Sequence, residues 1–248
     1  MTEPIGRQFM RLTRYGEMGP GDEALGKPQP PLETAPAAGA TIIKLTPPTA
    51  LGIPPVELRD AIEQRRSLRD FRDQPLEEAE LSWLLWACQG VRMVSSLATF
   101  RNVPSAGARH ALDTYVLVNR VAGVAAGLYR FVATRHELEL ICPDAGGAHS
   151  LKARFAHACL GQHFIASAGV VLIWAADVYR MAWRYGQRGY RYLHLDAGHV
   201  CQNAALAAEA IDCGLCPVAA FDDDLLNAAL GLDGRDHLAL YLAAVGKR

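Results

Sequence analysis

The chain has 248 residues, half of them hydrophobic, and its 25 basic and 26 acidic residues give a formal net charge of -1. This composition excludes a disordered chain, and the length suffices for one large domain or two small ones. The near-neutral balance argues against nucleic acid or an anionic membrane as a partner, and the apolar run at residues 169–176 is too short to cross a bilayer.

The N-terminal segment is rich in proline, since ten of the 14 prolines lie in residues 1–55. Residues 1–54 are therefore predicted to form an extended arm. Apolar side chains such as Phe9, Leu12 and Ile43 favour an arm ordered against its own domain or a partner subunit, and a floppy tail is the alternative. The early arginines precede no apolar run, so we expect no signal peptide, and six scattered cysteines indicate a cytoplasmic protein with reduced thiols.

The pattern becomes regular from residue 55, and residues 55–248 are expected to form the folded domain. Helices are predicted at residues 56–66, 77–89, 150–160, 192–211 and 222–230. Strands are predicted at residues 114–119, 128–133, 137–141, 170–176 and 237–245. The strands at 128–133 and 137–141 form a hairpin that breaks a strict alternation of strand and helix. The predicted fold class is therefore α+β.

The predicted helix at residues 192–211 has small or apolar side chains on nearly every side from Ala197 onward. A helix that is apolar all round is buried all round. In a domain of this size the helix therefore lies either at the centre of the core or at a subunit interface, and the pattern alone leaves both open.

Two segments carry the chemistry that stands out. Arg65, Ser67 and Arg69 share one face if the chain is extended, and the two arginines still align as i and i+4 if it is helical. Either geometry suits a phosphate, and a solvated basic helix end is the alternative. Residues 104–108 have very small side chains, which would let backbone N–H groups approach a ligand. Together the two segments suggest a phosphate grip and a seat for a flat ring.

Other motifs are absent or weak. The sequence contains neither a Gly-x-Gly-x-x-Gly opening a helix nor a Walker loop, so a Rossmann dinucleotide site is not expected. Cys213 and Cys216 have the spacing of a redox pair, but they follow a helix instead of beginning one, which favours two packed small residues. His194 and His199 are five apart and do not share a helical face, so no metal site is predicted. No side chain is singled out as catalytic.

The chain resembles the FMN-dependent nitroreductase superfamily, and within it the branch of SagB-type dehydrogenases. The resemblance rests on several short stretches that occur in family order over residues 55–248: 65–71, 81–90, 104–110, 127–130, 194–203 and 217–223. It implies an α+β nitroreductase-like fold with an antiparallel-rich central sheet flanked by helices. It also implies an intertwined homodimer with FMN at the subunit interface, and we expect Ala204 and Ala208 in that interface.

The resemblance also implies a set of cofactor-binding residues. Arg65, Ser67 and Arg69 match the family's ligands to the phosphate, ribityl chain and ring edge, and a backbone N–H near Ala219 and Ala220 matches the contact to flavin N5. Ala111 and Ala219 depart from the pattern, where the branch often has proline and glycine. The full expected set is Arg65, Arg66, Ser67, Arg69, Pro104, Ser105, Ala106, Gly107, Pro217, Val218, Ala219, Ala220, Lys247 and Arg248.

Three functions are compatible with these features. The first is an FMN-dependent oxidoreductase that passes electrons from NAD(P)H to a small organic acceptor such as a nitroaromatic or a quinone. The second is an FMN-dependent azoline oxidase or dehydrogenase acting on a modified peptide, and the third is a flavin-binding module without turnover. In the first two the flavin carries the chemistry and the protein supplies binding and electrostatics.

Overall fold

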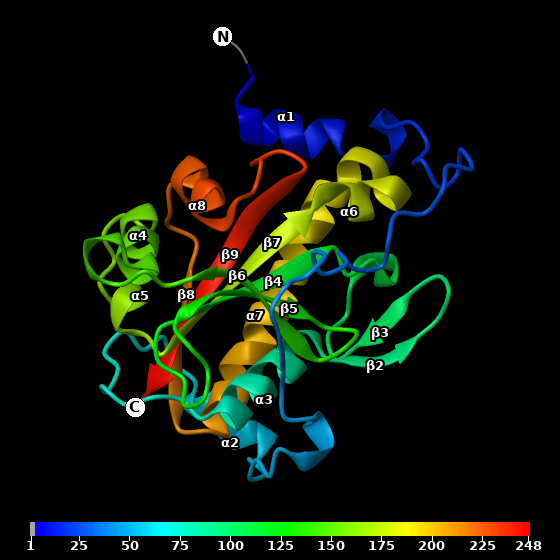
Figure 1. Ribbon diagram of the computed structural model, residues 1–248. Coiled ribbons are helices and arrows are strands. Elements are labelled where there is room, and N and C mark those ends of the chain that lie inside the picture. Colours follow the sequence, from blue (N-terminus) through cyan, green and yellow to red (C-terminus); the bar gives the residue numbers. More distant parts are fainter. Residues whose placement is uncertain (1–2) are drawn as a thin grey trace.

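A computed structural model describes residues 3–248 and shows a mixed sheet-and-helix fold (Figure 1). Seven strands form one sheet in the order β1-β6-β5-β4-β7-β9-β8, and every neighbouring pair is antiparallel. This confirms the α+β class and the antiparallel-rich central sheet. The strands are β1 (Ile42–Lys44), β4 (Leu112–Val118), β5 (Gly127–Val132), β6 (Glu137–Pro143), β7 (Val170–Asp177), β8 (Cys213–Val218) and β9 (His237–Lys247), and β2 (Val91–Val94) and β3 (Thr99–Arg101) form a separate hairpin.

Helices cover both faces of the sheet. One core contains side chains of α3 and α7, and the other contains side chains of α4, α5 and α8. On β7, Leu172 and Trp174 enter the first core while Val171 and Ile173 enter the second, so the strand reads as an unbroken apolar run. The helices are α1 (Ile5–Leu12), α2 (Leu58–Gln64), α3 (Glu78–Gln89), α4 (Leu151–Ala158), α5 (Phe164–Ser167), α6 (Val178–Tyr185), α7 (Gly189–Glu209) and α8 (Asp223–Leu230).

Local sequence explains where the site-bearing helices stop. Helix α3 starts with a reciprocal capping box between Glu77 and Glu80 and ends at Gly90, where an added Cβ would lie 2.4 Å from the Trp86 carbonyl oxygen. Helix α2 is shorter than the predicted 56–66, because Glu57 is its N-cap and Arg65 has already left helical dihedral angles (φ -54°, ψ 122°). The chain after Gln64 is therefore extended.

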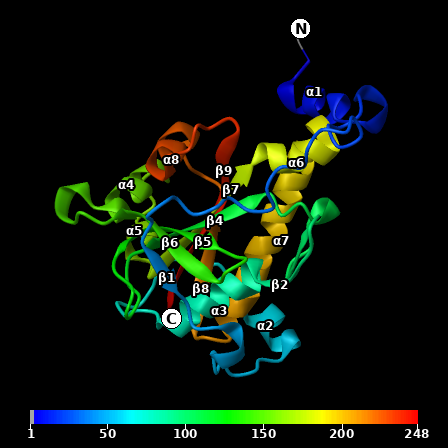
Figure 2. The same ribbon diagram turned by 45° about the vertical axis from the view of Figure 1, so that its right-hand side comes forward.

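The N-terminal arm lies along its own chain. Strand β1 pairs with β6 at the sheet edge, as Figure 2 shows. Further back, the Arg130 guanidinium donates to the Thr34 and Ala35 carbonyl oxygens at 2.7 and 3.1 Å. The Glu33 carboxylate accepts a 2.7 Å hydrogen bond from the Ala133 N–H. The arm thus covers polar groups that the rest of the chain would otherwise leave unsatisfied.

Helix α7 corrects one expectation and also limits where a partner can pack. Ala204 and Ala208 have no exposed surface, because they face α3 and the sheet within the chain's own core. They are therefore core residues and not free interface residues. The exposed side of α7 instead carries Leu195, which is 59% exposed, and Gly198. Within residues 3–248, no helix is long and apolar enough to cross a membrane.

Candidate functional site

The segment after α2 runs beside strand β8 as a short extra strand. Ser67 forms a parallel bridge with Leu215, and the Leu68 N–H donates to the Leu215 carbonyl oxygen at 3.1 Å. Gly214 has to be glycine for this contact, because an added Cβ would lie 2.2 Å from the Leu68 side chain. Of the two geometries considered from sequence, the extended one is observed.

Arginines gather beside the C-terminal end of strand β9, where β8 begins. A cavity of about 410 Å³ is lined by Glu63, Gln64, Arg65, Arg66 and Arg248. In residues 3–248 no carboxylate lies within ion-pair distance of Arg65, Arg66 or Arg69. The guanidiniums of Arg65 and Arg66, which have no such partner, therefore make this open cavity suited to a phosphate.

The two C-terminal basic residues have different surroundings. Arg248 lines the cavity and is also paired with Glu209. The Lys247 ammonium is almost buried, and it donates to a Glu80 carboxylate oxygen at 2.5 Å and to the Ile211 carbonyl oxygen at 3.0 Å. Lys247 is thus held between α3 and the end of α7, and of the two residues only Arg248 borders the cavity.

The end of strand β8 continues the arginine-lined surface. Pro217 and Val218 are the last residues of β8, and the exposed Ala219 and Ala220 follow. The Ala220 carbonyl accepts a 2.8 Å hydrogen bond from the Gln162 amide, which fixes this turn. The Arg69 guanidinium lies 5.8 Å from the centre of the Phe164 ring, so its charge stands next to an apolar wall.

The small-residue loop at 104–108 packs on the N-terminal half of α7. The Ser105 hydroxyl donates to Asp196 Oδ2 at 2.6 Å, and its oxygen accepts from the His110 N–H at 2.9 Å. Gly107 has φ +57° and an added Cβ there would lie 2.5 Å from the Tyr185 hydroxyl. Packing against α6 thus explains at least this small side chain.

The expected free N–H groups of this loop are mostly engaged within the chain. The N–H groups of Ala106, Ala108, Arg109 and His110 all have acceptors in the protein. The Arg109 side chain donates to the Leu97 and Gly107 carbonyl oxygens, so it holds the loop and is not available to a phosphate. Residues 104–107 would therefore contact a ligand mainly through their side chains and the fixed loop surface. They offer few free backbone N–H donors.

Two titratable groups under this loop have shifted pKa values. Burial raises the pKa of Asp196 above its ordinary value, although the hydrogen bonds from Ser105 and Ala106 act against the shift. Burial, with the nearby positive charge of Arg101, lowers the pKa of His110 to about 3, so this imidazole is neutral near pH 7. Sequence reasoning did not single out Asp196, whose role depends on a contact 91 residues away.

The small-residue loop and the arginine cavity contact different parts of α7. Asp196 marks the position of the Ser105 loop on α7, and Glu209, which pairs with Arg248, marks that of the arginine cavity. At a rise of 1.5 Å per residue, about 20 Å of helix separates these positions.

The Cys213–Cys216 spacing does not form a redox pair. Both thiols are buried on strand β8, and burial raises the pKa of Cys213 to about 12. Three residues along a strand span about 10 Å, which is too far for a disulfide. Both residues are packed in the core, as the alternative interpretation held.

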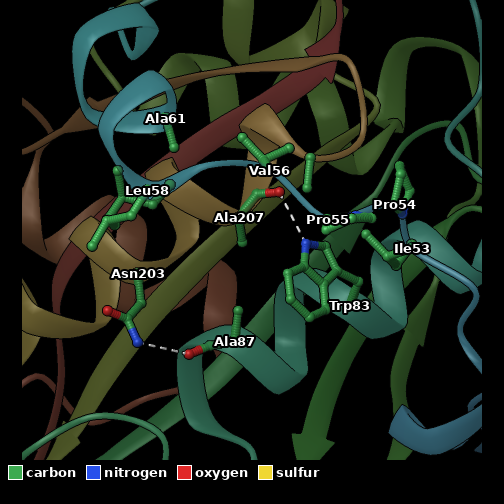
Figure 3. A pocket seen from close by; sticks show the side chains of 12 residues that line it. Ile53, Pro54, Pro55, Val56, Leu58, Ala61, Trp83, Ala87, Asn203 and Ala207 are labelled. Atoms are coloured by element: carbon green, nitrogen blue, oxygen red, sulfur yellow. Dashed lines mark hydrogen bonds between the residues drawn. The ribbon is translucent and has the colours of Figure 1, made fainter.

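A separate apolar groove lies at the C-terminal end of α7 and was not predicted from sequence. Its volume is about 480 Å³, and Ile53, Leu58, Trp83 and Leu206 are among its lining residues. Figure 3 shows the Trp83 indole N–H donating to the Ala207 carbonyl oxygen at 2.9 Å, which fixes the ring in the groove wall. The indole N–H of Trp83 and the carbonyl of Ala207, both in the groove wall, thus satisfy each other by a hydrogen bond.

Comparisons with known proteins point to one family. The sequence model of the nitroreductase family matches residues 62–247. The chain is 39% identical over 193 residues to "Putative nitroreductase MJ1384" of Methanocaldococcus jannaschii, covering 78% of this chain and 92% of that protein. It is 31% identical over 134 residues to the trifolitoxin-processing protein TfxB of Rhizobium leguminosarum bv. trifolii, covering 53% of this chain and only 35% of that protein. A solved structure of a "putative nitroreductase" from Ralstonia eutropha JMP134 is similar with a TM-score of 0.68 and 27% identity, over 89% of this chain and 97% of that one.

Proposed function

The chain belongs to the nitroreductase family, a family of flavin-using oxidoreductases, and we propose that it is an FMN-dependent oxidoreductase. It passes electrons from NAD(P)H to an organic acceptor such as a nitroaromatic or a quinone. The observation that carries the choice of FMN is the cavity bordered by Arg65, Arg66 and Arg248 beside the C-terminal end of β9.

The chemistry of this cavity fits a terminal phosphate. FMN ends in a phosphate dianion, and paired guanidinium donors match phosphate oxygens two at a time. Arg65 and Arg66 have no carboxylate partner among the described residues, so they would bind the phosphate without first breaking an ion pair. Ser67 follows them on the extended segment, where its hydroxyl is exposed and would reach the ribityl chain.

The flavin ring would lie along the end of β8. Arg69 would stand at the ring edge, with Pro217, Val218, Ala219 and Ala220 below it. A positive charge there stabilises negative charge on the reduced ring and raises the reduction potential. The other face would be covered by Pro104, Ser105, Ala106 and Gly107 of a second copy, since the loop lies about 20 Å along α7 from the cavity of its own chain. The site would therefore be completed only in a homodimer.

When bound, FMN supplies two-electron transfer from a nicotinamide donor to an acceptor. The chain's own residues bind the phosphate, hold the ring and shield one face from water. We assign no acid–base side chain. His110 is buried under the loop, and its pKa of about 3 makes it a weak base that carries no proton to donate as an imidazolium near pH 7.

An anaerobic titration tests the proposal. The purified protein is expected to be yellow, to release FMN on denaturation, and to bleach rapidly when NADH or NADPH is added without oxygen. Oxidation by a nitroaromatic or a quinone is then expected to restore the colour. A protein that carries FAD, or that takes up no added FMN, would refute the cofactor assignment.

A second candidate is FMN-dependent oxidation of an azoline ring in a modified peptide. It is favoured by the 31% identity to a trifolitoxin-processing protein over about half of this chain. In the same cuvette, bleaching by an azoline peptide but by neither nicotinamide would select this function. Bound FMN that neither donor reduces would indicate a flavin-binding module without turnover.

A further inference from the structure

Helix α1 (Ile5–Leu12) projects from the molecule with an apolar stripe that is largely exposed. Ile5, Phe9 and Leu12 fall on one face, and they are 84%, 38% and 49% exposed. In Figures 1 and 2 the helix stands at the top of the molecule, and none of its residues is buried. Within the chain, the Phe9 ring is partly covered by the Arg191 guanidinium, 5.8 Å from the ring centre. A short helix with so little of its apolar side covered is only marginally stable by itself.

This helix is nevertheless fixed in place against the first turns of α7. Arg191 donates to the Met10 carbonyl oxygen at 2.5 Å and to the Thr13 hydroxyl at 2.6 Å, and Arg188 donates to the Thr13 carbonyl oxygen at 2.9 Å. The stripe is therefore presented at a defined position at the start of α7.

The apolar groove lies at the other end of the same helix. Its floor includes Leu206 and Ala207 of α7, and Val56 and Leu58 at its border are 42% and 65% exposed. The distance along α7 from Arg191 to Ala207 is about 24 Å. Helix α1 therefore cannot fill the groove of its own chain.

A two-fold axis brings the two surfaces together. The two-copy site proposed above brings the Asp196 part of one α7 toward the Glu209 end of the other, so the two α7 helices run antiparallel. The middle of α7 suits such an axis, because Gly198 is exposed and an added Cβ there meets no atom within 4 Å. Arg191 precedes His199 by as many residues as Ala207 follows it. An axis at this point thus sets Arg191 of one copy opposite Ala207 of the other.

We propose that α1 of each copy docks its Ile5–Phe9–Leu12 stripe in the apolar groove of the second copy. This inference rests on the proposed function, because the antiparallel α7 pair follows from the two-copy flavin site. The net charges agree with it. Residues 3–14 carry Arg7, Arg11 and Arg14 against Glu3, which pairs with Arg11. Residues 57–64 beside the groove carry Glu57, Asp60 and Glu63 against Arg59, which pairs with Glu63. A basic helix would thus meet an acidic border.

Cysteine cross-linking tests the contact. The variant Ile5→Cys with Leu58→Cys is expected to give a covalent dimer on a non-reducing gel after mild oxidation. No intrachain bond competes, since the two positions lie at opposite ends of α7. The matched control is Arg7→Cys with Leu58→Cys, which places the thiol on the other face of α1, and the wild type measures the background of its six native cysteines. Equal cross-linking in both variants, or none in the first, would overturn the proposal.

The same samples separate this inference from the proposed function. Light scattering with flavin absorbance on one elution peak reports the dimer and the cofactor independently of the cross-link. A yellow dimer without the cross-link overturns the docking of α1 but leaves the flavin site intact. A colourless monomer overturns the two-copy site itself and the docking with it. Sedimentation of the protein with anionic vesicles, without cross-linking, would assign α1 to a lipid surface and also overturn the proposal.

A second variant checks the energetics without cysteines. Ile5→Asp puts a charge on the most exposed residue of the stripe, where the chain's own fold does not depend on it. We expect the dissociation constant of the dimer to be about tenfold higher than that of the wild type or more, which corresponds to about 1.4 kcal/mol. An unchanged dissociation concentration would contradict the docking.

Discussion

The Ser105 hydroxyl donates a 2.6 Å hydrogen bond to the Asp196 carboxylate, which joins the small-residue loop to the middle of α7. The Ala106 N–H adds a longer contact of 3.4 Å to the same carboxylate. In the proposed dimer this loop covers the flavin held by the other copy. The position of this loop over the flavin is thus set by α7, the helix through which the two copies would pack.

Replacing Asp196 is expected to loosen the loop. Asp196→Ala leaves the Ser105 hydroxyl without its acceptor, which costs about 1–3 kcal/mol of stability when the group stays buried. Asp196→Asn retains an acceptor oxygen and is expected to keep flavin affinity near that of the wild type. Urea unfolding and flavin fluorescence titration measure the two effects. Equal flavin affinity in the Ala and Asn variants would show that this contact does not position the loop.

The pH dependence of Asp196→Asn follows from the raised pKa of the wild-type carboxyl. Because the folded pKa lies above the unfolded one, the stability linked to this group is present below the unfolded pKa and is lost as the pH rises through the folded pKa. The Asn variant lacks this loss. Its unfolding free energy relative to the wild type is therefore expected to increase from acid to neutral pH, and a pH-independent difference would contradict the assignment.

Removing Arg65 is expected to weaken FMN binding. The loss of a charge-assisted phosphate contact costs about 1.5–3 kcal/mol, or about ten- to a hundredfold in affinity. The control is Arg59→Ala, which removes the same charge from α2 at a side chain that is 84% exposed and pairs with Glu63. Fluorescence titration with FMN compares the variants, and equal dissociation constants would remove Arg65 from the site.

The sequence predicted the regular elements well where local patterns decide them. The strands at 128–133 and 137–141 do form an antiparallel hairpin, because two apolar runs are joined by a short turn, and the pairing shifts register between Leu128 and Tyr129. Helix α6 and the β2–β3 hairpin were missed. The hairpin turns at two serines instead of the Asn-Gly type that signals a turn, and α6 directly follows the apolar run of β7.

Long-range contacts account for what the sequence left open in the site. The spacing of Arg65 and Ser67 places both on one segment. The distance from that segment to Ser105 depends on which parts of α7 the two regions contact, and the sequence does not reveal these contacts. Arg130 and Arg180 look like surface arginines in the sequence, yet both are buried, because their carboxylate partners come from other strands and turns. Propensity and periodicity do not contain this information.

The buried Arg130–Glu139 ion pair is expected to be costly to break. The two side chains are 5% and 3% exposed and lie 2.5 Å apart between β5 and β6. Glu139→Ala would leave the Arg130 guanidinium buried without its counter-charge, at a cost of about 3–5 kcal/mol. Glu63→Ala breaks an exposed pair and should cost no more than about 0.5 kcal/mol. Denaturant unfolding measures both, and similar losses would contradict the distinction.

The Cys213 and Cys216 thiols are expected to be dispensable for flavin reduction. Burial raises the pKa of both thiols, to about 12 for Cys213, so neither is a thiolate near pH 7. The variant Cys213→Ala with Cys216→Ala should be reduced by the electron donor at the wild-type rate. Stopped-flow bleaching of the bound flavin measures this rate. A folded double variant whose flavin no longer bleaches would show that the pair takes part in electron transfer.

The exposed middle of α7 is expected to control the dimer and the cofactor together. Gly198→Glu places a charge where the chain itself leaves open space, so the monomer should fold with a wild-type circular dichroism spectrum. In the proposed dimer the same charge would be buried unpaired between two helices at a cost of several kcal/mol. The variant should therefore be monomeric and colourless. Gln187→Glu adds the same charge at an exposed position before α7 and should stay yellow and dimeric. Light scattering with flavin absorbance on the same elution peak decides, and a Gly198→Glu protein that remains a yellow dimer would exclude this face from the interface.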